Sequence, residues 1–159
     1  FCSVGDVTNL AIAKGRSCLF TRVAPAGLGS IVGALASTAQ LSHEHAQMWL
    51  GHVGLAQPLE QVEGDPEIVA KTRTALERGA ASLLDELRLS IDFYGAQEAA
   101  VPIEQIVLCG PGSAIPGLAE HMAPSLGLPV TSSLPYALTG FDTPSAARLT
   151  VPYGLALEQ

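Results

Sequence analysis

The chain has 159 residues, of which 48 % are hydrophobic, and a formal net charge of −7; a chain of this size buries roughly 70 % of its unfolded surface, so one compact domain with one or two lobes is expected. The eight Lys and Arg residues are scattered along the chain, which argues against nucleic acid or anionic lipid as a direct partner. No apolar run reaches the ~18 residues that would predict direct membrane insertion. Three widely spaced cysteines without a C-x-x-C pair predict neither a disulfide framework nor a zinc site, and they fit a reducing cytoplasm.

The first 26 residues are predicted to form strands. Residues 1–4, 10–13 and 19–23 have strand composition, and a polar, glycine-containing turn at 14–17 joins the last two into a hairpin. The chain begins without Met and enters a strand within three residues. We therefore expect it to be a fragment of a longer protein.

Helices are predicted for the middle of the chain. Residues 27–40 carry apolar side chains at helical spacing, and Ser42 is a suitable N-cap for a second helix that Gly54 ends. A long helix with one apolar and one charged face is predicted from Pro66 to Tyr94.

Side chains on these helices have structural interpretations. The charges of the long helix, in the pairs Glu67–Lys71 and Arg88–Asp92, are expected on a solvated face. Its aromatic pair Phe93-Tyr94 is expected in the core, as is Trp49 on the preceding helix.

A strand, loop, helix, strand unit is predicted next. Residues 106–109 form a continuous apolar run typical of a strand buried on both faces. A glycine-rich turn at 110–117 opens a helix that reaches about Leu126, and residues 128–130 follow as a short strand.

The C-terminal segment is predicted to be helical from Thr143 to Leu157, with Pro144 at the first position and a break at Pro152. Its apolar surface needs a partner. We therefore expect self-association of the isolated chain through this segment.

Two glycine turns are the candidate ligand-binding elements. The first is Gly5-Asp6-Val7-Thr8-Asn9, where backbone amides can cradle phosphate oxygens and the side chains of Thr8 and Asn9 can add donors. The alternative is a plain hairpin turn.

The second turn is Gly110-Pro111-Gly112-Ser113, between the carboxyl end of the buried strand and the amino end of a helix, where open α/β sheets bind ligands. A tight strand-to-helix connection is the alternative. The P-loop motif is absent from the sequence.

Other patterns carry less weight. Gly27-x-Gly29-x-x-x-Gly33 superficially resembles a dinucleotide loop, but it follows a hairpin and leads into two consecutive helices. His43, His45 and His52 are interpreted as surface or capping residues rather than metal ligands, because no carboxylate completes their set. No catalytic triad and no candidate general acid or base can be identified.

The order of elements resembles domain II of the actin-like ATPases, and the local sequence is similar to the PilM family of bacterial type IV pilus assembly proteins. The similarity is carried by residues 5–10, 19–22, 89–94 and, most specifically, 108–118. It implies an α/β fold of the actin-like (RNase H-like) type, with a mixed sheet flanked by helices. Residues 1–26 and 104–159 would form a sheet subdomain and residues 27–103 a helical subdomain, with the first half of the protein missing.

The same resemblance implies a site for ATP with Mg²⁺. Residues 3–9 match the second phosphate-binding loop, residues 110–113 match the adenosine loop, and Arg88 and Ser90 fall on a helix that flanks the adenine. Ser3 replaces the acid that helps hold the metal in the family, and the first turn is one residue shorter than in many relatives. Both differences weaken the case for hydrolysis and leave binding intact.

The implied function is that of a cytoplasmic, ATP-binding scaffold with little or no ATPase activity, associated with the inner membrane through its partners. The cytoplasmic tail of a PilN-like inner-membrane protein would dock on the missing half. Two alternatives stay open: an active ATPase or kinase of the actin-like superfamily, or an FtsA-like cell-division or cytoskeletal protein.

Overall fold

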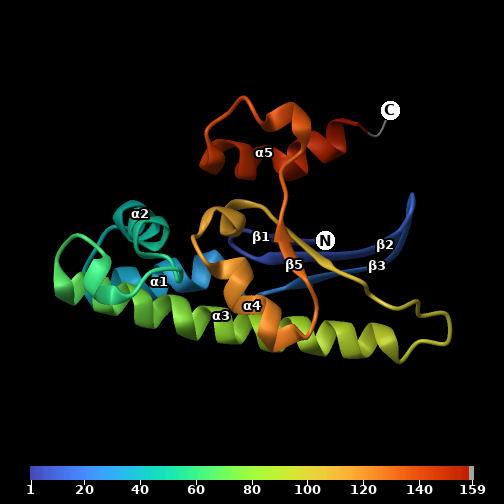
Figure 1. Cartoon of the computed structure of the whole chain (residues 1–159), viewed down its shortest axis with the longest axis horizontal. Coiled ribbons are helices and arrows are strands. Elements are labelled where there is room, and N and C mark those ends of the chain that lie inside the picture. Colours follow the sequence, from blue (N-terminus) through green and yellow to red (C-terminus); the bar gives the residue numbers. More distant parts are fainter. Residues whose placement is uncertain (158–159) are drawn as a thin grey trace.

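The computed structural model describes residues 1–157, apart from the side chains of Pro144 and Leu155. Its centre is a five-stranded mixed sheet (Figure 1) with the order β3-β2-β1-β4-β5. The strands are β1 (Cys2–Val4), β2 (Thr8–Lys14), β3 (Ser17–Ala24), β4 (Ile106–Cys109) and β5 (Val130–Ser132). β1, β2 and β3 are joined antiparallel, whereas β4 runs parallel to both β1 and β5. The predicted hairpin and buried strand are therefore parts of one sheet.

Within residues 1–157, five α-helices pack beside or beyond this sheet. They are α1 (Leu28–Ala39), α2 (His43–Val53), α3 (Pro66–Gly95), α4 (Leu118–Leu126) and α5 (Thr143–Ala156), and the short 3₁₀ turn η2 (Pro111–Ala114) precedes α4. In Figure 1, α3 lies along one side of the sheet and extends past it to carry α1 and α2, while α5 lies on the other side. Among the described residues, no helix is long and apolar enough to cross a bilayer.

The helix starts follow from local capping. The Ser42 hydroxyl accepts a hydrogen bond from the His45 amide, and the Asp65 carboxylate accepts from the amides of Glu67 and Ile68. Each side chain satisfies amides that have no partner within the first turn of the helix. The predicted cap at Ser42 is confirmed.

One hydrophobic core joins the sheet to the helical part of the chain. Val4 of β1 and Leu108 of β4 belong to the same buried cluster as Leu35 of α1, Leu50 of α2 and Leu76 of α3. Leu35 and Leu108 are 0 % exposed, and burying one such side chain stabilises the fold by about 1.5–3 kcal/mol. The two regions are thus held in a fixed arrangement by shared packing.

Two predicted boundaries are wrong. α5 continues through Pro152 to Ala156; proline removes one helical donor there, but the residue is exposed, so water can satisfy the carbonyl that loses its partner. β5 begins at Val130 rather than Leu128, because Leu128 packs against the core and the carbonyl of Pro129 accepts from the Ile106 amide at 2.8 Å.

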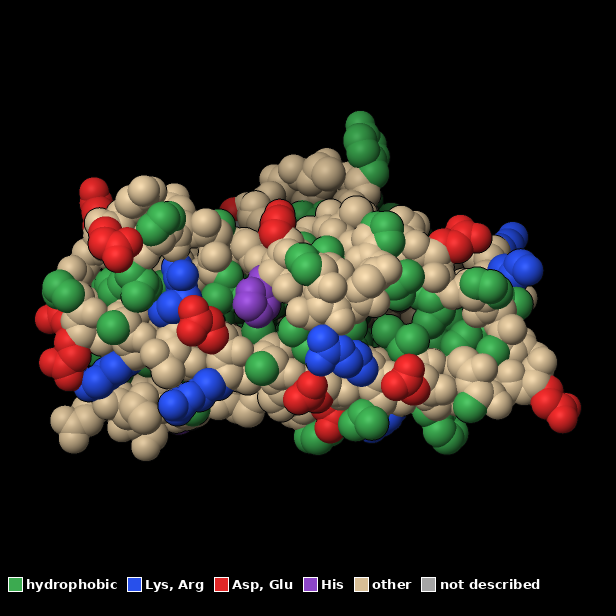
Figure 2. Space-filling view, turned by 60° about the horizontal axis from the view of Figure 1, so that its bottom comes forward, with side chains coloured by type: hydrophobic (Ala, Val, Ile, Leu, Met, Phe, Trp, Pro, Cys, Tyr) green, Lys and Arg blue, Asp and Glu red, His purple; other side chains and the backbone are tan. Residues whose placement is uncertain are grey.

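Two side-chain predictions on α3 are also corrected. Phe93 is 62 % exposed rather than buried, although its ring lies 6.0 Å from the ring of Phe20, whereas Tyr94 is in the core as expected. Arg88 pairs with Asp85 at 3.3 Å and not with Asp92. The expected Glu67–Lys71 pair is present at 2.6 Å, and Figure 2 shows charges of both signs interspersed along this face of the molecule.

Candidate functional site

The structure brings the two predicted glycine turns together at one edge of the sheet. β1 and β4 are parallel neighbours, so the turns that follow Val4 and Cys109 lie side by side. A Cβ atom on Gly110 would lie 2.8 Å from Ser3 Oγ, and one on Gly112 would lie 2.6 Å from Val4 Cβ. The second turn therefore packs directly on the end of β1.

The first turn is held by the start of α1. The amide of Gly5 donates to Val7 O at 3.0 Å, and the amides of Leu28 and Gly29 donate to Gly5 O and Asp6 O at 2.7 and 3.2 Å. Asp6 and Val7 are exposed residues, and within the described part of the chain their backbone amides donate to no other group. These two amides are free to bind an anion.

The glycines at the start of α1 serve this contact. A Cβ atom on Gly27 would lie 2.6 Å from Asp6 O, and one on Gly29 would lie 3.1 Å from the same atom. The spacing that superficially resembles a dinucleotide loop thus reflects close packing of a helix start against a turn.

Thr8 and Asn9 do not face the same ligand, contrary to the sequence-based expectation. Thr8 is 0 % exposed, and its hydroxyl donates to Ala26 O at 2.6 Å. Asn9 is the next residue of β2, so its side chain lies on the opposite face of the sheet, where it is exposed. The Thr8 hydroxyl is a structural group in this fold.

The second turn is closed by its own hydrogen bonds. Gly110 has a φ of +74°, in the left-handed region that favours glycine. The amide and hydroxyl of Ser113 both donate to Gly110 O, at 3.0 and 2.8 Å. The hydroxyl that sequence analysis assigned to ligand binding is therefore already used within the turn.

Arg88 and Ser90 lie elsewhere. The guanidinium of Arg88 donates to Ser125 O at 2.9 Å, near the far end of α4 from the second turn. The Ser90 side chain is 2 % exposed and donates to Glu86 O at 2.6 Å. The structure does not bring these two side chains to the glycine turns.

A cavity of about 350 Å³ opens beside the second turn, within the range of small-molecule sites. Four elements line it: the start of α1, one face of α2, the second turn and α5. The lining residues are Leu28, Glu44, Gln47, Met48, Leu50, Gly51, Pro111, Ala114, Ile115 and Arg148. One residue of the second predicted site, Pro111, thus lines the cavity, together with Ala114 and Ile115 that follow the site in the chain.

The α2 wall of this cavity was missed by sequence analysis. Glu44, Gln47, Met48 and Gly51 stand at positions i, i+3, i+4 and i+7, which is one face of a helix. Gly51 was the sequence signal that could have revealed this wall. Glycine in a helix interior destabilises the helix, so its presence there suggests a packing or functional reason. A Cβ at Gly51 would meet nothing within 4 Å, so the residue leaves the cavity open.

The cavity combines an apolar lining with a few polar groups. Glu44 and Gln47 offer an acceptor and an amide, and Arg148 of α5 offers a cation beside Pro111 and Ala114. Such a lining suits a flat heterocycle that carries an exocyclic amine, with anionic groups directed toward the arginine.

The cysteines and carboxylates near the turns make no reactive centre. Burial raises the pKa of the Cys2 thiol to about 12 and also raises the pKa of Cys109, so both stay neutral near pH 7. No cluster of three or more His, Cys, Asp or Glu residues that could hold a metal occurs in residues 1–157. Asp6, which is exposed, is the carboxylate of the first turn.

The mixed sheet, the flanking helices and the likeness to three solved structures show that the chain has the actin-like ATPase fold. Over 98 % of its length it is similar to a chain of the solved PilM-PilN type IV pilus biogenesis complex, with a TM-score of 0.72 and 21 % identity, covering 44 % of that chain. MreB5 of Spiroplasma citri bound to ADP gives 0.70 and 13 % identity, with 98 % of this chain and 51 % of that chain covered. The ethanolamine utilization protein EutJ from Carboxydothermus hydrogenoformans gives 0.59 and 17 %, with 99 % and 47 % covered.

These likenesses establish the fold of the chain, which spans about half the length of the structures that it matches. No protein-family model matches the sequence, and no curated protein matches it.

Proposed function

We propose that this chain is the second half of an actin-like scaffold that binds ATP, with the adenosine in the cavity between α2 and the second turn. The observation that carries the proposal is the position of this cavity, which borders the second turn at the sheet edge where the first turn also lies. Ligands of open α/β sheets bind at this edge.

Each wall has a role in the proposed complex. Glu44 and Gln47 hydrogen-bond the amine edge of the base, the apolar side chains of Leu28 and Ile115 contact its faces, and Arg148 pairs with a phosphate. The free amides of Asp6 and Val7 bind phosphate oxygens at the first turn. Mg²⁺, when bound with ATP, neutralises phosphate charge.

The proposed role is binding with little or no turnover. Ser3, at the place where the resemblance implies a metal-holding acid, carries no charge, and Asp6 is the one carboxylate of the first turn. In a scaffold, bound nucleotide holds the two halves of the protein together, and this role does not require hydrolysis. Steady phosphate release from Mg-ATP by the longer natural protein would favour the ATPase or kinase alternative.

The cellular role that we propose is type IV pilus assembly. The likeness to a chain of the PilM-PilN complex and the pilus-like sequence around residues 108–118 support it. In this proposal the chain works with a first half that completes the cleft and takes the cytoplasmic tail of a PilN-like inner-membrane protein. The scaffold is then cytoplasmic and reaches the inner membrane through that partner.

The cavity can be tested by filling it. Gly51→Leu places a side chain where nothing lies within 4 Å, so we expect the fold to be retained and ATP affinity to fall at least about tenfold. The matched control is Gly33→Leu on α1, which also has open space but does not line the cavity. Titrations of Mg-ATP followed by ligand-observed NMR, with circular dichroism as the folding check, measure both effects.

Equal ATP binding by Gly51→Leu and the parent would contradict the proposed pocket. Gly112 is not a suitable probe, because a side chain there meets Val4 and disturbs the turn itself. The pilus role has its own test: a PilN-type tail peptide should retain the longer natural protein in a pull-down, and no retention with or without ATP would contradict that role.

A further inference from the structure

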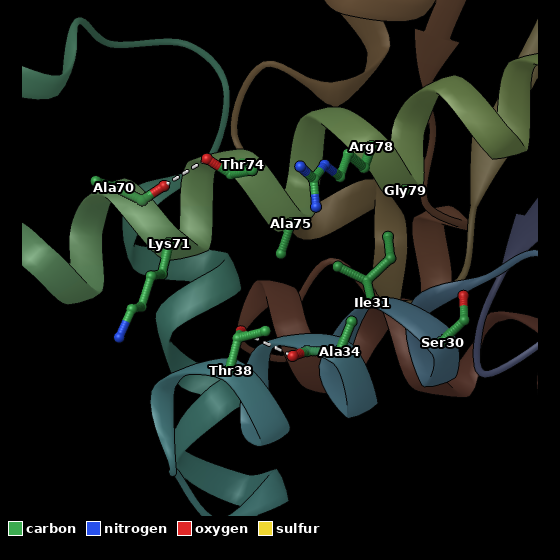
Figure 3. A pocket seen from close by; sticks show the side chains of 10 residues that line it. All are labelled: Ser30, Ile31, Ala34, Thr38, Ala70, Lys71, Thr74, Ala75, Arg78 and Gly79. Atoms are coloured by element: carbon green, nitrogen blue, oxygen red, sulfur yellow. Dashed lines mark hydrogen bonds between the residues drawn. The ribbon is translucent and has the colours of Figure 1, made fainter.

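A second hollow, unrelated to the glycine turns, lies between α1 and α3. It has a volume of about 420 Å³ (Figure 3). The two helices are in close contact where Gly79 lies against Ile31, since a Cβ on Gly79 would overlap the Ile31 side chain. From that contact the groove runs between the helices toward Thr38 and Lys71, as Figure 3 shows.

Apart from Lys71 and Arg78, the side chains that line the groove are apolar or already hydrogen-bonded. Ala34 and Ala75 face the hollow from the two helices (Figure 3). The hydroxyls of Thr38 and Thr74 donate to Ala34 O and Ala70 O, at 2.8 and 2.9 Å. Because these hydroxyls are already satisfied, an apolar side chain can enter the groove without breaking a hydrogen bond.

Two cations stand on the α3 side of this groove, and no carboxylate lines it. Arg78 is exposed and makes no ion pair or hydrogen bond with any other described residue. Lys71 pairs with Glu67 one turn away, with 38 % and 75 % of the two side chains exposed. Such an exposed pair is worth only ~0.3–0.5 kcal/mol, so Lys71 can exchange it for another carboxylate.

The contrast with the rest of the chain is informative. The molecule has a formal charge of −7, yet the two charged side chains that line this groove, Lys71 and Arg78, are both positive. Lys71 and Arg78 are seven residues apart, so they are separated by roughly 10 Å along α3. That spacing is two turns of a helix.

We propose that this groove binds an acidic amphipathic helix of a partner protein. Its apolar side chains lie over Ala34 and Ala75, and two carboxylates about seven residues apart pair with Lys71 and Arg78. Small residues on both walls let a helix approach closely, and the charges fix its register. No residue lines both this groove and the proposed nucleotide cavity.

A synthetic probe can test this proposal directly. We suggest a fluorescein-labelled 14-residue helical peptide with a Leu/Ala face and two glutamates seven residues apart, and a second peptide with glutamines in their place. Fluorescence anisotropy with the 159-residue chain should show that the glutamate peptide binds at least about fivefold more tightly, and that salt weakens its binding.

Two variants locate the binding. Arg78→Glu reverses the free charge and Ala34→Leu fills the groove from an exposed position, and each should weaken binding at least about tenfold. The controls are Arg16→Glu at the hairpin turn and Ala81→Leu on α3, which are exposed and outside the groove. Each control should change binding less than about twofold.

Three results would overturn the proposal. They are absence of peptide binding at millimolar concentration, equal binding of the two peptides, and equal loss in the groove variants and their controls. A dimer in light scattering that Ala34→Leu dissociates would instead assign the groove to a second copy of this chain.

Discussion

The two glycine turns lie side by side but need their glycines for different reasons. In the second turn the crowding falls on the turn itself, because a Cβ on Gly112 would lie 2.6 Å from Val4 Cβ. In the first turn a Cβ on Gly5 would make only an ordinary contact of 3.6 Å, and the crowded position is Gly27 at the start of α1. A glycine near a candidate site can therefore serve packing, and the residue that most needs to be glycine can belong to the neighbouring element.

The largest effect predicted from this comparison is that of Gly27→Ala. The new Cβ would lie 2.6 and 2.7 Å from the backbone oxygens of Asp6 and Gly5, which cannot move without displacing the whole turn. We expect a loss of about 3 kcal/mol or more in the free energy of unfolding. Urea denaturation measures this loss.

The control for that prediction is Gly33→Ala on the same helix. Nothing lies within 4 Å of its Cβ position, so alanine should stabilise the chain by up to about 1 kcal/mol. Similar behaviour of the two variants would contradict the described contact between α1 and the first turn.

A smaller effect is predicted within the turns themselves. Gly112→Ala should cost about 1–3 kcal/mol, because the Val4 side chain can give way only in part. Gly5→Ala should cost less than about 1 kcal/mol, since its contact is at ordinary distance. If thermal or urea unfolding ranked Gly5→Ala as the more damaging change, the contrast between the turns would be wrong.

The smallest effect concerns α5, which packs on η2 in the second turn. Hydrogen bonds from Ser145 lower the pKa of the Asp142 carboxylate, which caps this helix. Because the pKa is lower in the folded state, the ionised carboxylate stabilises the helix fully at pH values above its unfolded pKa of about 3.9. This stabilisation is lost as the pH falls through the lower pKa of the folded state.

Acidification below about pH 4 should therefore fray the start of α5. Amide hydrogen exchange should show earlier loss of protection at Ser145 and Ala146 than in α1. Asp142→Asn, which keeps capping ability without the charge, should remove this pH dependence. A persistent dependence in that variant would assign the effect to another group.

The sequence predicted the elements of the fold well, because periodicity and capping act locally. The predicted cap at Ser42 is a contact between near neighbours in the chain, and the long apolar face of α3 follows from a local periodic pattern. The boundary of β5 and the exposure of Phe93 depended on tertiary packing that no local pattern reports.

The candidate site was predicted only in part. The resemblance assigned residues 3–9 and 110–113 to one nucleotide site, and the parallel pairing of β1 and β4 in the structure sets the two turns side by side. The use of the Thr8 and Ser113 hydroxyls inside the fold could not be seen, since their acceptors are set by backbone geometry. The α2 wall became visible only when the structure set it opposite the second turn.

The most direct test of the central claim is a two-dimensional ¹H–¹⁵N NMR titration of the chain with Mg-ATP. We expect the strongest shifts at Gln47, Met48, Gly51 and Ala114, with smaller shifts at Asp6 and Val7 from the phosphates and none in α3 around Ser90. Shifts centred on Arg88 and Ser90, or no shifts at millimolar ATP, would contradict the placement of the nucleotide beside the second glycine turn.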